Sequence, residues 1–505
     1  MKIALRTRLN VRSARQRGFL KEGGRQPAPD HLRPTIYLHK SSVPFGSQAA
    51  AQIRSPHLRV DSPRSAHTPD LPMADSSVNP FLRIPPLIHT EDPGSPPPES
   101  ILLDRYGYLS CRLNGTTADG FTADGKRIQV TFWAASPPRV SCFTVHSPDV
   151  KPSAFDWLPK VIYSKDDLVL LRIPILRQDD SRDAKSCHYF VYQAGTENNR
   201  PSLKMLPIPC DIKFSNNENG KRFDLHLYNS KTGTWNTENQ FVDSVNYVNY
   251  SYPNIAVTIG GEFGSVGWVD LWRGMLICDL LRDNHSLRYI PLPLPLVPKL
   301  LKGYPMCFRD IVVVGDCIKY FEMSYDVRPG SGLTSATQDL VAATKKMKIS
   351  DIGSGNNWEE DCTFKFSDIP VDSPKFARML MLPNLKQVKN TKLTLMRLCA
   401  GYPALSLHDA DVVYIMHTPD PDEDKALVIA LDMRKKTLKD VADFGSGRPL
   451  GYTFTYLQSG ISKHLNIWSS SRSGRNAGET SRDGCLGPCK LEVLWVNAEQ
   501  QPNAT

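Results

Sequence analysis

The sequence predicts a mainly β fold, an irregular β-propeller-like repeat of antiparallel sheets with disordered segments at both ends. Between residues 101 and 466, short apolar runs of four to seven residues recur between turn signals, as in "IQVTFWA", "NIAVTIGG" and "ALVIALDM". Runs rich in Val, Ile and aromatic residues are typical of β-strands. The 40 prolines, against 32 glycines, favour short connections over long helices.

The strands also repeat a common pattern. "HYFVYQAGTENNRPSLKMLPIP", "GMLICDLLRDNHSLRYIPLP" and "ALVIALDMRKKTLKDVADF" each read as two antiparallel strands joined by a tight polar turn. Their centres fall roughly 35–60 residues apart, comparable to the about 40–50 residues of a four-stranded propeller blade. Because the spacing is irregular, an elaborated β-sandwich is the alternative. Helices are expected at only two places, residues 337–349 and 373–382.

Composition divides the chain into four parts. Residues 1–78 form a basic segment expected to be disordered, and residues 79–100 a Pro-rich linker that includes "EDPGSPPPES". The propeller-like domain then spans residues 101–466. Residues 467–505 form a polar tail that is also expected to be disordered.

The positive charge lies in the N-terminal segment. Residues 1–72 hold 13 Lys/Arg and 4 Asp/Glu, which accounts for the whole net charge of +9. The remainder is neutral, so a folded nucleic-acid-binding domain is disfavoured, and weak binding through the basic arm stays an alternative. Seven Lys/Arg and no acid in the first 21 residues resemble a mitochondrial or plastid presequence. The other interpretation is that Met73 is the start of translation.

Cysteine usage and hydropathy indicate the compartment. The eleven cysteines are scattered and nowhere form C-x-x-C, as in reduced thiols of an intracellular protein. No apolar run approaches the about 18 residues of a membrane span, so we expect a soluble protein without membrane contact. The expected location is the cytoplasm or nucleus, or a mitochondrion or plastid if residues 1–72 act as a transit peptide.

No motif for a cofactor, a metal or a catalytic nucleophile stands out. The order of residues in nucleotide-binding loops and in the G-x-S-x-G elbow is absent. Asp420, Asp422 and Asp424 have the spacing that begins a calcium loop, but Lys425 and Leu431 occupy the positions where an EF-hand needs Gly and Glu. We therefore expect no cofactor, no metal and an acidic hairpin tip there.

Residues 267–281, "GWVDLWRGMLICDLL", combine two tryptophans with two aspartates. On a strand, Trp268, Asp270 and Trp272 share one face, whereas Val269 and Leu271 share the other. Asp270 lacks the second acid, base or metal ligand that catalysis requires. The stretch is therefore interpreted as a structural anchor, with an indole or backbone partner for Asp270 and no catalytic residue.

This stretch, with "SLRYIPLPLPLVPK", "RDIVVVGDCIKYFEM" and "NWEEDCTFKFSDI", resembles the plant family known as domain of unknown function 1618, which is expanded in grasses. The likeness extends over roughly residues 100–466, with a core at about 267–370. It implies a plant source and a propeller-like fold similar to F-box-associated domains, and no activity. The signature residues, all expected to be structural, are Trp268, Asp270, Trp272, Gly274, Asp279, Arg288, Tyr289, Trp358 and Cys362. A Trp-containing strand expected between "KYFEM" and "NWEEDC" is missing.

The sequence does not determine a reaction or a ligand. We expect a non-enzymatic protein-interaction module of a plant cell, with another protein as its partner and no assignment for a small molecule. The alternative from a different class is an enzyme that uses the central channel of the propeller. It requires several Asp, His or Arg side chains to converge on the axis.

Overall fold

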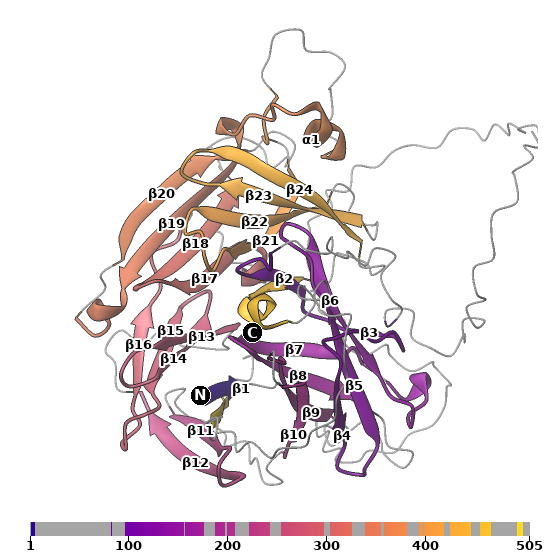
Figure 1. Cartoon of the computed structure of the whole chain (residues 1–505). Coiled ribbons are helices and arrows are strands. Elements are labelled where there is room, and N and C mark those ends of the chain that lie inside the picture. Colours follow the sequence, from indigo (N-terminus) through magenta and orange to yellow (C-terminus); the bar gives the residue numbers. More distant parts are fainter. Residues whose placement is uncertain are drawn as a thin grey trace, which may run out of the picture.

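The computed structural model describes the greater part of the chain between residues 96 and 465, together with two short terminal strands. The described residues are 2–5, 82, 96–155, 157–175, 187–196, 199–207, 222–242, 254–296, 304–325, 339–354, 358–380, 393–396, 398–418, 425–445, 455–465 and 492–497. Within them the chain is mainly β-structure, arranged as sheets around a centre (Figure 1).

Four sheets are each built from four consecutive, antiparallel strands. The first holds β7 (Lys160–Lys165), β8 (Leu168–Pro174), β9 (Cys187–Gln193) and β10 (Ser202–Leu206). The second holds β13 (Ile255–Gly260), β14 (Ser265–Asp270), β15 (Gly274–Asp279) and β16 (Leu287–Pro291). The third holds β17 (Arg309–Val314), β18 (Cys317–Tyr325), β19 (Leu340–Lys348) and β20 (Glu359–Lys365). The fourth holds β21 (Ala400–Leu405), β22 (Val412–His417), β23 (Lys425–Asp432) and β24 (Thr437–Gly445).

A fifth four-stranded sheet combines a hairpin with the two ends of the chain. The hairpin is β11 (Arg222–Asn229) and β12 (Thr234–Phe241). β26 (Glu492–Asn497) pairs antiparallel with β11, and β1 (Lys2–Leu5) pairs parallel with β26. Both terminal strands fall in segments that the sequence predicted to be disordered, and the rest of residues 1–78 and 467–505 lies outside the described residues. The apolar, β-branched and aromatic composition of residues 493–496 explains the strand β26.

The sixth sheet has six strands and joins the two ends of the propeller-like domain. It holds β25 (Tyr456–Ser459), β2 (Ile101–Asp104), β3 (Tyr108–Leu109), β4 (Ala118–Phe121), β5 (Arg127–Trp133) and β6 (Val140–His146). β25 pairs antiparallel with β2, and β2 pairs parallel with β6. A late strand of the domain is thus held by its first strand, and this pairing fixes the two ends of the domain together.

Six hydrophobic clusters fill the spaces between neighbouring sheets. The β7–β10 sheet packs on the six-stranded sheet on one side and on β11 and β12 on the other. The β13–β16 sheet lies between β11 and the β17–β20 sheet. The β21–β24 sheet packs on the β17–β20 sheet and on β2, β6 and β25. Since every sheet has a neighbour on both sides, five small blade-like sheets and the six-stranded sheet form a closed ring (Figure 1).

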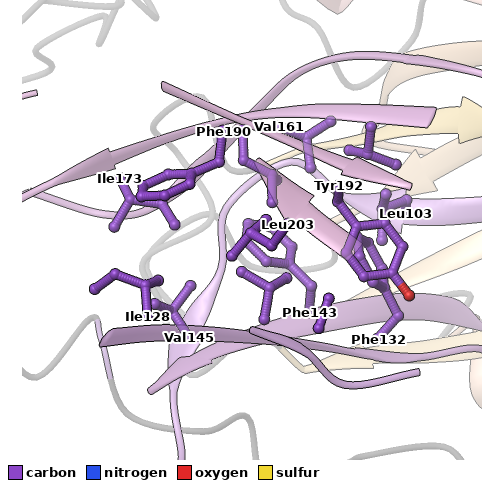
Figure 2. Packing of buried hydrophobic residues seen from close by; sticks show 14 of the residues in the cluster. Leu103, Ile128, Phe132, Phe143, Val145, Val161, Ile173, Phe190, Tyr192 and Leu203 are labelled. Atoms are coloured by element: carbon purple, nitrogen blue, oxygen red, sulfur yellow. The ribbon is translucent and has the colours of Figure 1, made fainter. Parts of the chain in front are cut away.

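The cluster between the six-stranded sheet and the β7–β10 sheet shows how neighbouring sheets are held (Figure 2). Phe132 and Phe143 project from the six-stranded sheet, and Phe190 and Tyr192 project from β9; all four are fully buried. The rings of Phe132 and Tyr192 are 4.6 Å apart between centroids. Burial of each such side chain contributes about 1.5–3 kcal/mol, so side-chain packing between sheets is a major source of the stability of the ring.

The predicted propeller-like β fold is confirmed, and the β-sandwich alternative is wrong because the sheets follow one another around a ring. The helix expected at residues 373–382 is confirmed as α1 (Pro374–Met379). The other helical turns are η2 (Pro152–Ala154), η4 (Pro305–Cys307), η6 (Ile349–Asp351), η7 (Phe366–Asp368) and η8 (Gly460–His464). None of the helices in the described part of the chain has the length and hydropathy needed to cross a membrane.

The helix expected at residues 337–349 is wrong, because this segment forms the strand β19. β19 pairs with β18 along its whole length and with β20 on its other side. Lys345 and Lys346 lie opposite Glu360 and Glu359 of β20, and Lys345 forms an ion pair with Glu360 at 3.7 Å. Hydrogen bonding on both edges outweighs the helical propensity of the segment. We had expected a Trp-containing strand between "KYFEM" and "NWEEDC". β19 takes that place in the sheet, between β18 and β20, and contains no tryptophan.

Candidate functional site

A cavity of about 210 Å³ lies at the centre of the ring, and we call it the central cavity. Its wall comes mainly from β7, β13, β17, β21 and β25, with Arg105 just beyond β2. β13 contacts β17, β17 contacts β21, β21 contacts β25, and β25 contacts β7. Because these strands belong to five different sheets, the central cavity exists only in the closed ring.

Four polar side chains of the cavity wall have buried atoms without a hydrogen-bond partner. One is Arg309 at Nε, whose other two nitrogens donate to Leu271 and Glu322. The others are Arg105 at Nε, Tyr456 at its hydroxyl and Gln458 at both amide atoms, and Tyr456 is only 3 % exposed. Arg105 adjoins β25 because its backbone N–H donates to the Thr455 carbonyl at 3.0 Å. Tyr456 and Gln458 are two residues apart on this strand and therefore point to the same side. A buried polar group without a partner costs about 1–3 kcal/mol, so these atoms mark a place where a ligand can supply hydrogen bonds.

Asp310, at the start of β17, brings a carboxyl group to the same cavity. Its Oδ2 accepts the N–H of Leu405 at 2.8 Å. Burial raises the pKa of this carboxyl to about 7, although the backbone N–H groups of Leu405 and Ile311 and the charge of Arg105 act in the opposite direction. Burial also raises the pKa of Tyr456 well above its usual value, and the charge of Asp310 adds to the effect. Asp310 therefore changes charge near neutral pH.

Cations gather around Arg105. Burial, together with the charges of Arg105 and Arg172, lowers the pKa of Lys160 to about 7. Arg172 lies directly opposite Lys160 on β8, and Lys160 Nζ lies 5.4 Å from the centre of the Tyr106 ring. Arg105 and Arg172, joined by Lys160 when it is protonated, produce a positive potential near one end of β7, which favours an anion.

Much of the remaining wall of the central cavity is apolar. It includes Ile162, Val257 and Val313. Tyr163 also lines it, with its hydroxyl hydrogen bonded to that of Thr258 across the gap between β7 and β13. An apolar wall with a few polar groups at one place is the usual composition of a small-molecule site.

Sequence reasoning did not find Arg105, Asp310, Tyr456 and Gln458. They come from three segments that are far apart in the chain, and none belongs to a functional sequence motif with a fixed residue spacing. The only local signal is a polar residue on an otherwise apolar strand, as at Asp310 in "DIVVVGD" and Gln458 in "TYLQSG". Such residues are common at strand ends, so this signal does not identify a site.

The signature residues lie elsewhere, mostly between sheets. Trp268 packs with Leu276 and Cys278 toward β11, and Val269 and Leu271 pack on the opposite side toward the β17–β20 sheet. This is the alternation that the sequence predicted for residues 268–271. Trp268 is fully buried, as expected for an anchor of the hydrophobic cluster.

Asp270 has the backbone partner that its position predicted. Its side chain accepts the Trp272 N–H at 2.9 Å and forms an ion pair with Arg273 at 3.1 Å. β14 ends at Asp270, however, so Trp272 lies in the turn. There the Arg309 guanidinium lies 4.6 Å from the centre of its ring. The expectation that Trp272 shares the face of Trp268 is therefore wrong, because the strand stops before it.

Gly274 and Tyr289 are in direct contact across β15 and β16. A Cβ atom at Gly274 would lie 2.5 Å from atoms of the Tyr289 ring. The Tyr289 hydroxyl then reaches past Gly274 and donates to the Arg273 carbonyl at 3.1 Å. The absence of a side chain at Gly274 thus allows Tyr289 to form this hydrogen bond and stabilise the β14–β15 turn.

Replacing Gly274 by alanine is expected to destabilise the protein by about 1–3 kcal/mol, because the new methyl group overlaps a ring held in place by its hydrogen bond. Denaturant unfolding measures this change. Gly115→Ala is the control, since nothing lies within 4 Å of a Cβ there. Equal stability of the two variants would contradict the contact with Tyr289.

Asp279 forms a polar cluster at the other end of β15. It accepts from Ser265 Oγ at 2.6 Å and from Arg288 Nη2 at 2.9 Å, and it forms an ion pair with Arg282 at 3.2 Å. Arg288 lies on the neighbouring strand β16. Asp279 therefore links three strands of one sheet and the turn that follows it.

Trp358 and Cys362 lie at the edge of the β17–β20 sheet and contact the neighbouring sheets. The indole N–H of Trp358 donates to the Pro291 carbonyl at 3.0 Å. The thiol of Cys362 donates to the Met433 carbonyl at 3.5 Å, and burial raises its pKa. All nine signature residues thus have contacts inside the fold, and their structural role stays our proposal.

No group of three or more His, Cys, Asp or Glu is placed to hold a metal ion in the part of the chain that the structure describes. The acidic tip with Asp420, Asp422 and Asp424 lies outside the described residues.

The ring of blade-like sheets around a central cavity defines a propeller-type protein. Residues 268–414 match the family described as "Protein of unknown function (DUF1618)", which confirms the resemblance seen in the sequence. The match runs from β14 to β22, so it covers most of two sheets and part of a third. Comparison with curated proteins gave no match.

Two solved structures show a distant likeness. Kuenenia stuttgartiensis hydrazine synthase is 11% identical, with 65% of this chain and 81% of that chain covered and a TM-score of 0.24. Cobalt-substituted Synechocystis ACO is 10% identical, with 73% of this chain and 85% of that chain covered and a TM-score of 0.23. Likeness at this level carries no argument about the function of this protein.

Proposed function

We propose that this protein is a protein-interaction module of a plant cell and that it contacts its partner through the tip of the β13–β16 sheet. The blade tip consists of Phe263, Gly264, Leu281 and Arg282, from the β13–β14 and β15–β16 turns. It offers an aromatic ring, an exposed leucine and an arginine on one surface.

The contacts within the blade tip support this proposal. The Leu281 N–H donates to the Phe263 carbonyl at 3.0 Å, which fixes one turn against the other. The Arg282 guanidinium stacks 3.6 Å above the Phe263 ring. Leu281 is 57% exposed, although it is a large apolar side chain. Aromatic residues and arginine are enriched at protein interfaces and among the residues that dominate binding energy, so this cluster is the observation that carries the proposal.

The compartment belongs to the same proposal, with the cytoplasm or nucleus as the location. Six cysteines among the described residues are free thiols, as the scattered cysteines in the sequence led us to expect: Cys111, Cys187, Cys307, Cys317, Cys362 and Cys399. Burial raises the pKa of several, including Cys187 and Cys307, which makes them less reactive. Imaging of the tagged full chain tests the location, and a secreted or organellar signal would contradict it.

Replacing Leu281 by aspartate is expected to abolish capture of the partner, because a charge replaces the apolar centre of the blade tip. The tagged full chain and the variant are each used for affinity capture from plant lysate, with mass spectrometry of the retained proteins. Leu294→Asp is the matched control, since Leu294 is 83% exposed and lies beyond β16, outside the blade tip.

The proposal requires a protein retained in near-stoichiometric amount by the wild type and by Leu294→Asp, and lost from Leu281→Asp. Retention by all three proteins would show that the blade tip is not the contact. Thermal unfolding of both variants establishes that they remain folded.

A further inference from the structure

We propose that the central cavity binds a small monocarboxylate with an apolar, ring-sized body, and that Arg105, Tyr456 and Gln458 hold its carboxylate. This ligand site is distinct from the blade tip, and its test does not depend on a protein partner. It rests on three features of the cavity: unpartnered donors, an excess of positive charge and an apolar wall.

The donors point to an anionic group. Arg105 Nε, the Tyr456 hydroxyl and the Gln458 amide nitrogen are all donors that are buried without a partner. A carboxylate accepts about four hydrogen bonds through its two oxygens, and an arginine matches it in geometry. Arg172, and Lys160 when it is protonated, add positive charge near Arg105. A neutral ligand would leave at least part of this charge without compensation.

The charge balance favours a carboxylate over a phosphate. Asp310 lines the same cavity and lies near both Arg105 and Tyr456. When this carboxyl is ionised, it offsets part of the cationic charge. A dianion would meet repulsion from Asp310, whereas a single negative charge can be held by Arg105. Arg309, the other arginine in the wall, is already paired with Glu322 at 2.8 Å.

The size and wall of the cavity define the rest of the ligand. Cavities of about 150 Å³ accommodate benzene, so about 210 Å³ suits a ligand of roughly ten non-hydrogen atoms. Ile162, Val257 and Val313 provide apolar contacts for a ring or a branched chain. Lys165 lines the cavity and is partly exposed at the β7–β8 turn, so the cavity reaches solvent there.

The test uses the full chain and four probes in calorimetric titration and ligand-observed NMR. Benzoate and phenylacetate represent the proposed ligand, benzamide is the neutral isostere of benzoate, and phenyl phosphate is the dianionic analogue. We expect binding of at least one carboxylate, at least about tenfold tighter than benzamide, because charged hydrogen bonds contribute about 1.5–3 kcal/mol. Absence of binding by both carboxylates would overturn the proposal. Equal affinity for benzamide, or tighter binding of phenyl phosphate, would do the same.

Substitutions locate the site. Arg105→Gln and Tyr456→Phe are each expected to weaken carboxylate binding at least about tenfold, since each removes a donor to the charged group. Arg112→Gln is the matched control, because Arg112 is exposed on the segment between β3 and β4. Wild-type affinity in both cavity variants, shown to be folded by thermal unfolding, would place the ligand elsewhere. Leu281→Asp should bind the carboxylate normally, which separates this site from the blade tip.

The pH dependence provides a second readout. The titratable and charged side chains that line the cavity with Asp310 are Arg105, Tyr163, Lys165, Arg309, Tyr402 and Tyr456. As pH falls through about 7, Asp310 loses its negative charge and Lys160 gains a positive one, so the carboxylate should bind more tightly at pH 6 than at pH 8. Asp310→Asn should bind more tightly than the wild type at pH 8. Weaker or unchanged binding by this variant would contradict the position given to the carboxylate.

Discussion

Replacing Glu322 by alanine is expected to lower the free energy of unfolding by about 3–5 kcal/mol. Glu322 and Arg309 form an ion pair at 2.8 Å, and both side chains are buried. The Tyr320 hydroxyl donates to the second carboxylate oxygen at 3.1 Å, and Arg309 also donates to the Leu271 carbonyl of the neighbouring sheet at 2.8 Å. Without Glu322, the guanidinium would stay buried with its charge uncompensated.

Denaturant unfolding measures this effect, and a surface glutamate provides the control. Glu360 is 81% exposed and pairs with Lys345, so Glu360→Ala should change stability by no more than about 0.5 kcal/mol. The double variant Arg309→Met with Glu322→Ala should recover part of the loss, since it removes the buried charge. A double variant less stable than Glu322→Ala alone would show that the lost carboxylate, rather than the unpaired arginine, causes the defect.

Replacing Trp268 by alanine is expected to cost about 3–5 kcal/mol. Trp268 is fully buried and belongs to the cluster that joins the β13–β16 sheet to β11, together with Phe223 and Leu225. Removal of the indole leaves a void between two sheets that are each held by their own hydrogen bonds. The void cannot close unless a whole sheet shifts, so the loss of stability caused by the cavity remains.

Trp157→Ala is the matched control for this substitution, because Trp157 is 66% exposed. Its effect on denaturant unfolding should stay within about 0.5 kcal/mol. If both tryptophan variants lose similar stability, the cluster between β11 and the β13–β16 sheet contributes less to the free energy of unfolding than its burial predicts.

The family match and the central cavity overlap only in part. Residues 268–414 include Asp310 and the strands β17 and β21. Arg105, Tyr456 and Gln458 come from segments on either side of the match, and they meet through the pairing of β2 with β25. The matched region therefore supplies Asp310 and Arg309 to the cavity, and the flanking segments supply Arg105, Tyr456 and Gln458.

The sequence by itself determined the local structure of most blades. The alternation along the strand predicted that Trp268 lies on one face and that Val269 and Leu271 lie on the other, and the turn residues predicted the hairpins. These signals are local, because side chains alternate along every strand and tight turns join strands that are adjacent in the chain. The segment 337–349 was one exception, since only the pairing of its backbone with β18 and β20 decides between helix and strand.

Tertiary structure alone decided the closure of the ring and the contents of its centre. Closure depends on the pairing of β2 with β25, whose residues are separated by most of the chain. Arg105, Asp310 and Tyr456 have ordinary sequence neighbours, and only the closed ring brings them together. Their chemistry also arises there, because burial moves the pKa of Asp310 to about 7 and deprives the donors of Arg105 and Tyr456 of water. The residues around each of these side chains in the sequence do not predict the shifted pKa or the unpartnered donors. Both properties arise only when long-range packing excludes solvent from the centre of the ring.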